Sequence, residues 1–461
     1  MKHSGMKFRN AFLKNNARIV NTIAELTGSA FNASRASMDI SVFKGLEPYL
    51  EQHTQPISDE VSKTVSQILK KVRKNGDKAL RRYSRRFDKV EVNKFLVSEQ
   101  DQQKALDSID SRFQKVLIQA TNNIRKFHER QKTETQLKRD QDGTILGWKV
   151  TPIDCVGIYV PGGRAVYPSS VLMNVVPAQV AGVPRIAIVT PPGKNGLPHP
   201  LIMASARLLN VNELYSVGGA QAIGALAYGT ESIAPVYKIT GPGNAYVAEA
   251  KRQVFGTVGI DSFAGPSEIT IICDRKDAPV EYLVRDMLSQ AEHDPNARAL
   301  LITTSQKQAN AVAKRLEELI PTLPKKEIIS ASFSKNSAIV VIKSLKKIFD
   351  AVNEIAPEHL EVITKNPLND LNKIRNAGAI FLGMETPEPV GDYFAGPNHT
   401  LPTSRCARFS SPLGVQDFVK NSSVLMYSKE RLQREASSII RFAKEEALFA
   451  HAAAIQVRVK S

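Results

Sequence analysis

The sequence predicts an α/β protein with two consecutive parallel-sheet units, a mainly helical region before them and a helical tail after them. Apolar residues recur at helical spacing in the first third of the 461-residue chain. From about residue 150, short β-branched runs end in glycine or proline and lead into helical patterns, which indicates parallel sheets. A last helical pattern runs from Lys429 to about Val457. At roughly 150 residues per domain, the length suggests two to four domains.

The helical first third is predicted from two apolar stripes. The first stripe consists of Val61, Val65, Ile68, Leu69 and Val72. The second stripe consists of Phe113, Val116, Leu117, Ala120, Ile124 and Phe127. Each set falls on one face of a helix, so both segments are expected to bury that face. Gly76 follows a basic cluster and is expected to end the first helix.

The strands are predicted in two series. The first series is 156–160, 186–189, 214–217 and 236–239. The second series is 269–273, 299–303, 338–342 and 379–382. In the first series the strands run into polar glycine turns, and ligands of α/β folds bind at the carboxyl ends of strands. Several such turns in one sheet therefore favour a ligand crevice there.

The charge of the chain is high but unevenly placed. The 62 Lys and Arg against 45 Asp and Glu give a net charge of +17 and a pI near 9.6. Such a balance makes nucleic acid or an anionic membrane the first partner to consider. However, residues 1–150 hold +12 of the net charge, and no zinc-finger, RRM or KH signature accompanies them. We expect a solvated basic face, with neither nucleic acid nor a membrane as partner.

A nucleic-acid-binding protein built on this basic third is the alternative from another functional class. It would need aromatic residues interleaved with the basic ones, and only Tyr83 and Phe87 meet that description.

The cysteines and the apolar runs bear on the compartment. Cys155, Cys273 and Cys406 are isolated, which predicts neither a disulfide framework nor a thiolate metal site and suggests a reducing compartment. The sequence contains no run of 18 apolar residues, so it predicts no membrane span. We expect a cytoplasmic protein whose residues 1–37 form a mobile basic extension. Organellar targeting by residues 1–36 is a weaker alternative, and Met6 is a second candidate start.

One glycine turn begins like a dinucleotide-binding motif. It reads Gly241-Pro242-Gly243-Asn244-Ala245-Tyr246, so Tyr246 occupies the position of the third glycine. As a G-x-G-x-x-G motif it fails, and alone it predicts only a tight strand–helix turn.

Several late polar residues have spacings that suit chemistry. Gln290 and His293 are three apart, so on a helix their amide oxygen and imidazole nitrogen can meet one metal ion; taken alone, a solvated helix end is the simpler interpretation. The adjacent Glu358 and His359 suit two proton-transfer partners in one pocket. Asp392, in a segment predicted as a loop, is a candidate hard ligand. Glu446 and His451, on the terminal helix, could equally be surface residues.

Together these segments resemble the histidinol dehydrogenase family from about residue 38 to the end. Each motif is weak alone, but nine occur in the family's order. They are Tyr159-Val160-Pro161-Gly162-Gly163, Gly218-Gly219-Ala220-Gln221-Ala222-Ile223, Gly241-Pro242-Gly243-Asn244, Ala264-Gly265-Pro266-Ser267-Glu268, Ser289-Gln290-Ala291-Glu292-His293, Ala356-Pro357-Glu358-His359-Leu360, Gly391-Asp392-Tyr393, Asn398-His399-Thr400-Leu401-Pro402-Thr403 and Glu446 with His451.

The resemblance implies a fold and a domain plan. The fold would be two Rossmann-like parallel-sheet domains in an aldehyde-dehydrogenase-like architecture. Residues 38–155 with 265–412 would form the catalytic domain, 156–264 the NAD-binding domain, and 413–461 a dimerisation tail. Members are homodimers, so Glu446 and His451 would complete the partner's site.

The resemblance also implies an activity: oxidation of L-histidinol through L-histidinaldehyde to L-histidine, the last two steps of histidine biosynthesis, with two NAD reduced. One zinc ion per subunit would be bound by Gln290, His293, Asp392 and His451. His359 would be the general base, and Glu358 would activate water. The substrate would be held by Ser267, Gln290, His293, His359, Asp392, His399, Glu446 and His451. NAD would be contacted by Tyr159, Gln221 and Asn244.

Two points qualify the resemblance. Ser404-Arg405-Cys406 departs from the small, glycine-rich residues that many members carry there, although it includes none of the residues assigned above. The alternative within the same fold is a related dehydrogenase that oxidises another polar alcohol, such as a sulfonated diol. It would need the metal site and the Glu358–His359 pair but no carboxylate for an imidazole, so the presence of Glu446 favours histidinol.

Overall fold

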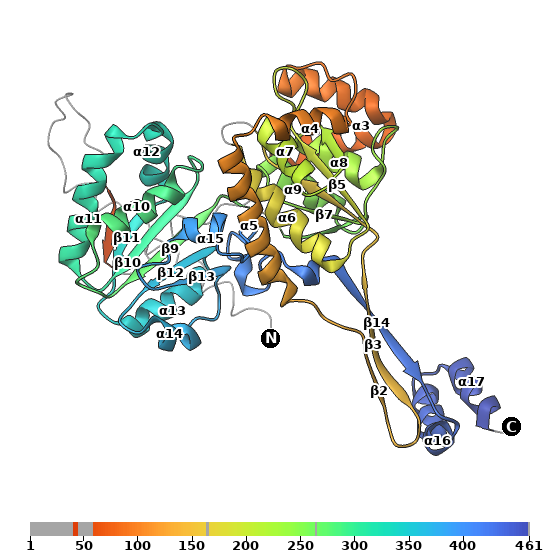
Figure 1. The fold of residues 1–461 in the computed structure, drawn as a ribbon. Coiled ribbons are helices and arrows are strands. Elements are labelled where there is room, and N and C mark those ends of the chain that lie inside the picture. Colours follow the sequence, from red (N-terminus) through yellow and green to blue (C-terminus); the bar gives the residue numbers. More distant parts are fainter. Residues whose placement is uncertain (1–39, 45–58, 163–165, 263–264, 460–461) are drawn as a thin grey trace, which may run out of the picture. The chain divides into compact units, whose positions relative to one another are not determined.

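The computed structural model describes residues 40–44, 59–162, 166–262 and 265–459 (Figure 1). Their strands form two parallel sheets and one antiparallel sheet, with helices between them. The predicted α/β fold with two parallel sheets is thereby confirmed. The expected mobile extension, residues 1–37, lies outside the described residues, as do His3, His53, Gly163 and Ala264.

The first parallel sheet has five strands in the order β6-β5-β4-β7-β8. The strands are β4 (Cys155–Tyr159), β5 (Arg185–Thr190), β6 (Glu213–Ser216), β7 (Lys238–Thr240) and β8 (Gly259–Ile260). Its helices are α6 (Pro168–Ala181), α7 (Pro200–Leu208), α8 (Gly219–Tyr228) and α9 (Ala245–Val254). The turns after β4, β6 and β7 therefore lie at one edge of the sheet.

The helices of the first third pack on the helices of this five-stranded sheet. They are α3 (Asp59–Tyr83), the short π-helical η1 (Ser84–Asp88), α4 (Glu99–Asp107) and α5 (Ser111–Glu129). The apolar stripe of α3 shares a core with α8, and that of α5 shares one with α6. Gly224 of α8 permits the close approach, because a Cβ there would lie 3.1 Å from Leu69 Cδ2. Gly76 breaks the helix with φ 48° and ψ −131°, but α3 resumes after it, so Gly76 is a kink and not the predicted end.

The second parallel sheet has six strands in the order β1-β11-β10-β9-β12-β13. They are β1 (Val42–Lys44), β9 (Glu268–Cys273), β10 (Arg298–Thr303), β11 (Ala338–Val341), β12 (His359–Ile363) and β13 (Ala379–Leu382). The helices are α10 (Val280–Ala291), α11 (Gln306–Leu319), α12 (Lys326–Lys335), α13 (Leu345–Ile355), α14 (Pro367–Asp370) and α15 (Glu388–Tyr393). Between them lie the 3₁₀ turns η2 (Ile320–Thr322) and η3 (Leu371–Lys373).

The structure places two groups of predicted site residues in this part of the chain and corrects one prediction. Glu358 and His359 follow the helix α13, and His359 opens the interior strand β12, whose five residues are all buried. Asp392 lies in the short helix α15 and not in a loop; Pro389 suits the first turn of a helix, where no amide partner is needed.

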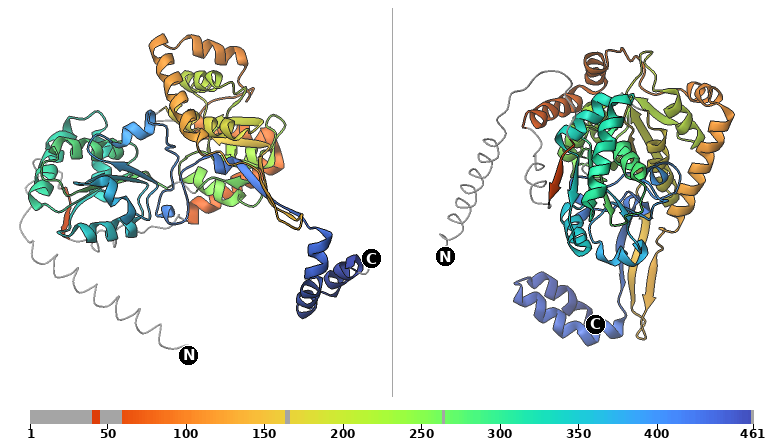
Figure 2. Two further views of the ribbon diagram at one scale, coloured as in Figure 1. Left: turned by 60° about the horizontal axis from the view of Figure 1, so that its bottom comes forward. Right: turned by 90° about the vertical axis from the view of Figure 1, so that its left-hand side faces the viewer.

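A three-stranded antiparallel sheet, which was not predicted from the sequence, leads to the tail (Figure 2). Its order is β14-β3-β2, formed by β2 (Gln136–Arg139), β3 (Ile145–Pro152) and β14 (Val419–Met426). Before β14 come the 3₁₀ turns η4 (Cys406–Arg408) and η5 (Val415–Phe418), and after it the tail helices α16 (Lys429–Glu445) and α17 (Phe449–Val459). Ion pairs of Arg431 with Asp140 (2.8 Å) and Arg434 with Asp142 (2.9 Å) attach α16 to the β2–β3 turn.

Three further expectations concern the whole described chain. All three cysteines are free thiols, as predicted. Within the described ranges, no helix has both the length and the apolar character needed to cross a bilayer. The domain plan remains a prediction: β1 joins the six-stranded sheet, α3 packs with the five-stranded one, and Ile40–Ser461 forms a single unit.

Candidate active site

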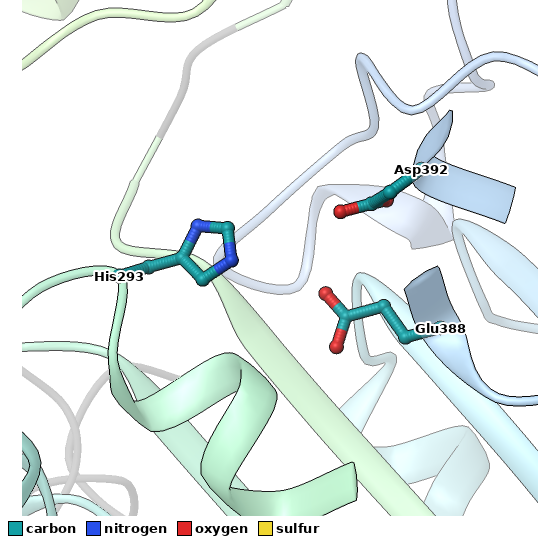
Figure 3. Close-up of side chains that lie close together, drawn as sticks. All are labelled: His293, Glu388 and Asp392. Carbon is teal, nitrogen blue, oxygen red and sulfur yellow. The ribbon is translucent and has the colours of Figure 1, made fainter. Parts of the chain in front are cut away.

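Three side chains converge between the end of α10 and the helix α15 (Figure 3). They are His293, Glu388 and Asp392, and one ligand atom of each lies within 4.8 Å of the others. His293 lies two residues beyond the end of α10, and its backbone N–H donates to Gln290 O at 3.2 Å. Glu388 and Asp392 are four residues apart on α15, so they share one face of that helix. Two carboxylates and an imidazole at this separation can bind one divalent cation.

Gln290 joins this group through Glu388. Its side chain is fully buried in the last turn of α10. With the amide nitrogen toward Glu388, it donates to Oε1 at 2.5 Å and to Oε2 at 3.0 Å. The opposite orientation would set the amide oxygen against two carboxylate oxygens, so the hydrogen bonds assign the orientation. Three of the four predicted zinc residues, Gln290, His293 and Asp392, are thus gathered around Glu388.

His359 lies beside this group with a defined tautomer. Its Nδ1–H donates to the backbone carbonyl of Glu268 at 3.0 Å, which leaves the lone pair on Nε2. Nε2 is 3.7 Å from Glu388 Oε1 and 3.8 Å from Asp392 Oδ1, and it has no hydrogen-bond partner among the described residues. Burial lowers the pKa of His359 to about 3, so its imidazole is neutral at neutral pH.

Glu358 is held by the same residue that orients His359. Its Oε2 accepts a hydrogen bond from the backbone N–H of Glu268 at 2.8 Å and lies 3.6 Å from His359 Nδ1. Burial raises the pKa of Glu358 well above its usual range, so the carboxyl group tends to hold a proton. The backbone of Glu268 therefore fixes both predicted proton-transfer residues.

His399 completes this side of the group. Its Nδ1 lies 4.0 Å from Asp392 Oδ1, and burial lowers its pKa to about 4. Burial also raises the pKa of Asp392 to about 7. A cavity of about 930 Å³ is lined by residues that include His359, Asp392, His399 and Asp261, so the polar group faces a space large enough for a small polar ligand.

The three predicted coenzyme residues lie at the turn edge of the five-stranded sheet. Tyr159 ends β4, and its hydroxyl accepts a hydrogen bond from Gly219 N at 3.1 Å. Gln221 is buried in the first turn of α8, and its Oε1 has no partner among the described residues. Asn244 caps α9 by accepting hydrogen bonds from Tyr246 N and Val247 N. The glycine turns after β4, β6 and β7 meet at this edge, and the ligand crevice there remains a prediction.

The remaining assigned residues lie elsewhere. Ser267 is half-buried next to Glu268, and its carbonyl accepts a hydrogen bond from Arg298 N at 3.0 Å. Glu446 caps the end of α16 and His451 lies in α17, and both are exposed. Within one described chain, neither is brought to the group around Glu388.

Sequence reasoning missed two carboxylates in this site. Glu388 is 2 % exposed and Glu268 is 4 % exposed. Glu388 could have been found, because it precedes Asp392 by four residues. Glu268 ends one of the family-like motifs, Ala264-Gly265-Pro266-Ser267-Glu268. Its role in the site depends on its backbone, which no side-chain pattern reveals. Glu268 Oε1 also accepts a hydrogen bond from Ser404 N at 2.9 Å. The segment 404–406, whose sequence differs from that of many family members, therefore contacts a neighbour of the site.

Comparisons with known proteins identify the family of this chain. A family model described as "Histidinol dehydrogenase" matches residues 51–459. The histidinol dehydrogenase of Geobacillus kaustophilus is 52 % identical over 403 residues, which cover 87 % of this chain and 95 % of that protein. The histidinol dehydrogenase of Bacillus subtilis is 50 % identical over 422 residues, which cover 91 % of this chain and 99 % of that protein. The crystal structure of histidinol dehydrogenase from Elizabethkingia anophelis superposes with a TM-score of 0.87 at 34 % identity. The superposition covers 93 % of this chain and 99 % of that chain. The chain belongs to the histidinol dehydrogenase family.

Proposed function

We propose that this protein oxidises L-histidinol through L-histidinaldehyde to L-histidine, the last two steps of histidine biosynthesis, with zinc bound and two NAD reduced. The observation that carries the proposal is the convergence of His293, Asp392 and Gln290 beside a buried, neutral His359. The choice of L-histidinol as the substrate is based on membership of the family. The protein would act in the cytoplasm.

The residues fit a zinc ion. Imidazole nitrogen, carboxylate oxygen and amide oxygen are all acceptable zinc ligands. The Asp392 carboxylate comes no closer than 3.8 Å to His359 Nε2 and 4.0 Å to His399 Nδ1. Its oxygens thus remain available to a cation. We assign the ion to Gln290, His293 and Asp392 of one chain and His451 of a second copy. When bound, zinc supplies a fixed positive centre that holds the imidazole and amine of the substrate.

His359 would accept the alcohol proton. Its Nδ1–H is fixed by the Glu268 carbonyl, so Nε2 alone carries a lone pair and faces Asp392. The same nitrogen would take the proton of the aldehyde hydrate in the second oxidation. Glu358 would act on the water that adds to the aldehyde, because its carboxyl group lies next to the imidazole at 3.6 Å.

The turn edge of the five-stranded sheet would hold the coenzyme. NAD supplies the acceptor for the two hydrides. Gln221 offers a buried amide oxygen that has no protein partner among the described residues, and Tyr159 and Asn244 lie on neighbouring turns. These three residues support an NAD site without the G-x-G-x-x-G motif.

A homodimer would bring Glu446 and His451 to the site. Both are exposed, and the antiparallel sheet and tail expose many large apolar side chains: Leu137, Trp148, Leu425, Met426, Phe442 and Phe449. Apolar surface of this extent marks a protein–protein interface. With Ser267 and His399 from one chain, Glu446 from the other would hold the substrate imidazole.

Product analysis tests the proposal. Purified protein with L-histidinol and NAD is expected to form L-histidine, and a chelator is expected to stop the reaction until zinc is restored. If zinc-loaded protein forms no histidine while oxidising another polar alcohol such as a sulfonated diol, the substrate assignment is wrong.

A further inference from the structure

Glu388 is a buried carboxylate with an unusual set of neighbours. It is 2 % exposed and opens α15. Its backbone N–H donates to Glu361 Oε1 at 2.8 Å, which fixes the start of the helix. Among the described residues, the only basic side chain within ion-pair distance is His359, at 3.7 Å. A buried carboxylate without a cationic partner is unfavourable unless hydrogen bonds or a metal compensate it.

Its side-chain hydrogen bonds go mainly to Gln290. The Gln290 amide nitrogen lies 2.5 Å from Oε1 and 3.0 Å from Oε2, and Ser289 Oγ is 3.4 Å from Oε2. An amide donates only through its nitrogen and binds cations only through its oxygen. By holding the nitrogen, Glu388 turns the Gln290 oxygen away from itself.

We propose that Glu388 is a positioning residue that fixes the Gln290 amide so that its oxygen, and not its nitrogen, is presented to the zinc ion. This inference rests on the proposed function, in which Gln290 is a zinc ligand. The competing role, Glu388 as a ligand itself, is suggested by its place within 4.8 Å of His293 and Asp392. We favour positioning because both Glu388 oxygens accept hydrogen bonds, whereas the Asp392 carboxylate lies 3.8 Å from His359 Nε2 and 4.0 Å from His399 Nδ1, beyond hydrogen-bond distance.

The test measures zinc affinity by chelator competition and the absorption spectrum of the Co²⁺-substituted protein. Glu388→Ala is expected to weaken zinc binding by about tenfold to a hundredfold, the usual effect of removing a residue that orients a ligand. Glu388→Gln is expected to restore most of that loss and to keep the Co²⁺ spectrum, because its amide oxygen can still accept from Gln290.

Glu292→Gln is the matched control for charge. Glu292 is next to His293, and its carboxylate pairs with Lys325 at 3.6 Å. It meets Gln290 only through the backbone, where its N–H donates to the Gln290 carbonyl, and its side chain makes no hydrogen bond to the Gln290 amide among the described residues. Its removal is expected to change zinc affinity less than Glu388→Ala does. An equal loss in both variants would mean that Glu388 acts through its charge alone, and the positioning role would be wrong.

A double-mutant cycle with Gln290→Ala separates positioning from ligation. If Glu388 acts through Gln290, Glu388→Ala has little further effect on zinc affinity in the Gln290→Ala background. If Glu388→Ala weakens zinc binding as much in the Gln290→Ala background as in the parent protein, Glu388 is a ligand and the inference fails. The same conclusion follows if Glu388→Gln shifts the Co²⁺ spectrum. A parent protein that binds no zinc would instead refute the proposed function, so the two failures are distinct.

Discussion

A single backbone segment orients the two residues that we propose for proton transfer, Glu358 and His359. The carbonyl of Glu268 fixes the His359 tautomer, and its N–H holds the Glu358 carboxyl group. The side-chain types could be predicted from the sequence, because an adjacent Glu and His suit acid–base work. Their orientation could not, because it depends on a backbone 90 residues away on the neighbouring strand.

His359→Asn tests the role of this imidazole. Asparagine can still donate to the Glu268 carbonyl, but it has no basic nitrogen in the place of Nε2. We expect kcat to fall by about 10²-fold to 10⁴-fold, the range for loss of a general base. Metal analysis of the same variant should show zinc still bound, and loss of the metal would mean that His359 is a ligand.

Asp88 gives a prediction about pH. Burial raises its pKa to about 6, and Oδ2 has no hydrogen-bond partner among the described residues. The folded state thus binds the proton more tightly than the unfolded state, so this contribution to stability is present at low pH and is lost as pH rises toward 6. Asp88→Asn should therefore raise the unfolding temperature more at pH 7.5 than at pH 4.5. An equal shift at both pH values would contradict the raised pKa.

At the scale of elements, the sequence predicted the parallel strands well and the irregular parts poorly. The eight predicted strands all match observed ones, because buried parallel strands read as continuous apolar runs. The antiparallel sheet was missed because β2 is exposed throughout and β14 nearly so, and neither shows such a run. Gly76 was misread because a glycine that kinks a helix and one that ends it look alike in sequence.

The turn after β7 provides a prediction at this scale. Gly241 has φ 108°, and a Cβ there would lie 2.1 Å from the Tyr159 carbonyl oxygen. Its N–H donates to Asp261 at 2.8 Å and its carbonyl accepts from Lys251 at 3.0 Å, so it has little room to move. Gly241→Ala should destabilise the protein by more than about 3 kcal/mol in urea unfolding, as severe backbone strain does.

Gly143→Ala is the control for that substitution. Gly143 has a comparable φ of 82°, but a Cβ there would meet nothing within 4 Å. It should show only the conformational penalty, about 1–2 kcal/mol. Equal losses in the two variants would show that the close approach to Tyr159 is unimportant.

For the whole molecule, the central question is whether one chain makes a complete site. Gln290, His293, Asp392, His359 and His399 gather within one chain, whereas Glu446 and His451 are exposed on the tail. A sequence cannot show which of these residues come from the same copy, because spacing along the chain carries no information about symmetry. The proposed homodimer accounts for both observations.

Mixing two inactive variants tests the shared site. His359→Asn and His451→Ala should each be inactive as homodimers. After the subunits are exchanged, a heterodimer has one site with both residues intact, so about a quarter of the parent activity should return if exchange is random. No recovery, with heterodimers shown to form, would mean that His451 serves its own chain.

The most direct measurement of the central claim is the number of NADH molecules formed for each L-histidine. Two oxidations at one carbon, with water added between them, require a ratio of two. We predict that ratio with L-histidinol, and a ratio of one for L-histidinaldehyde supplied as substrate. A ratio of one from L-histidinol, or NADH formed without L-histidine, would contradict the account.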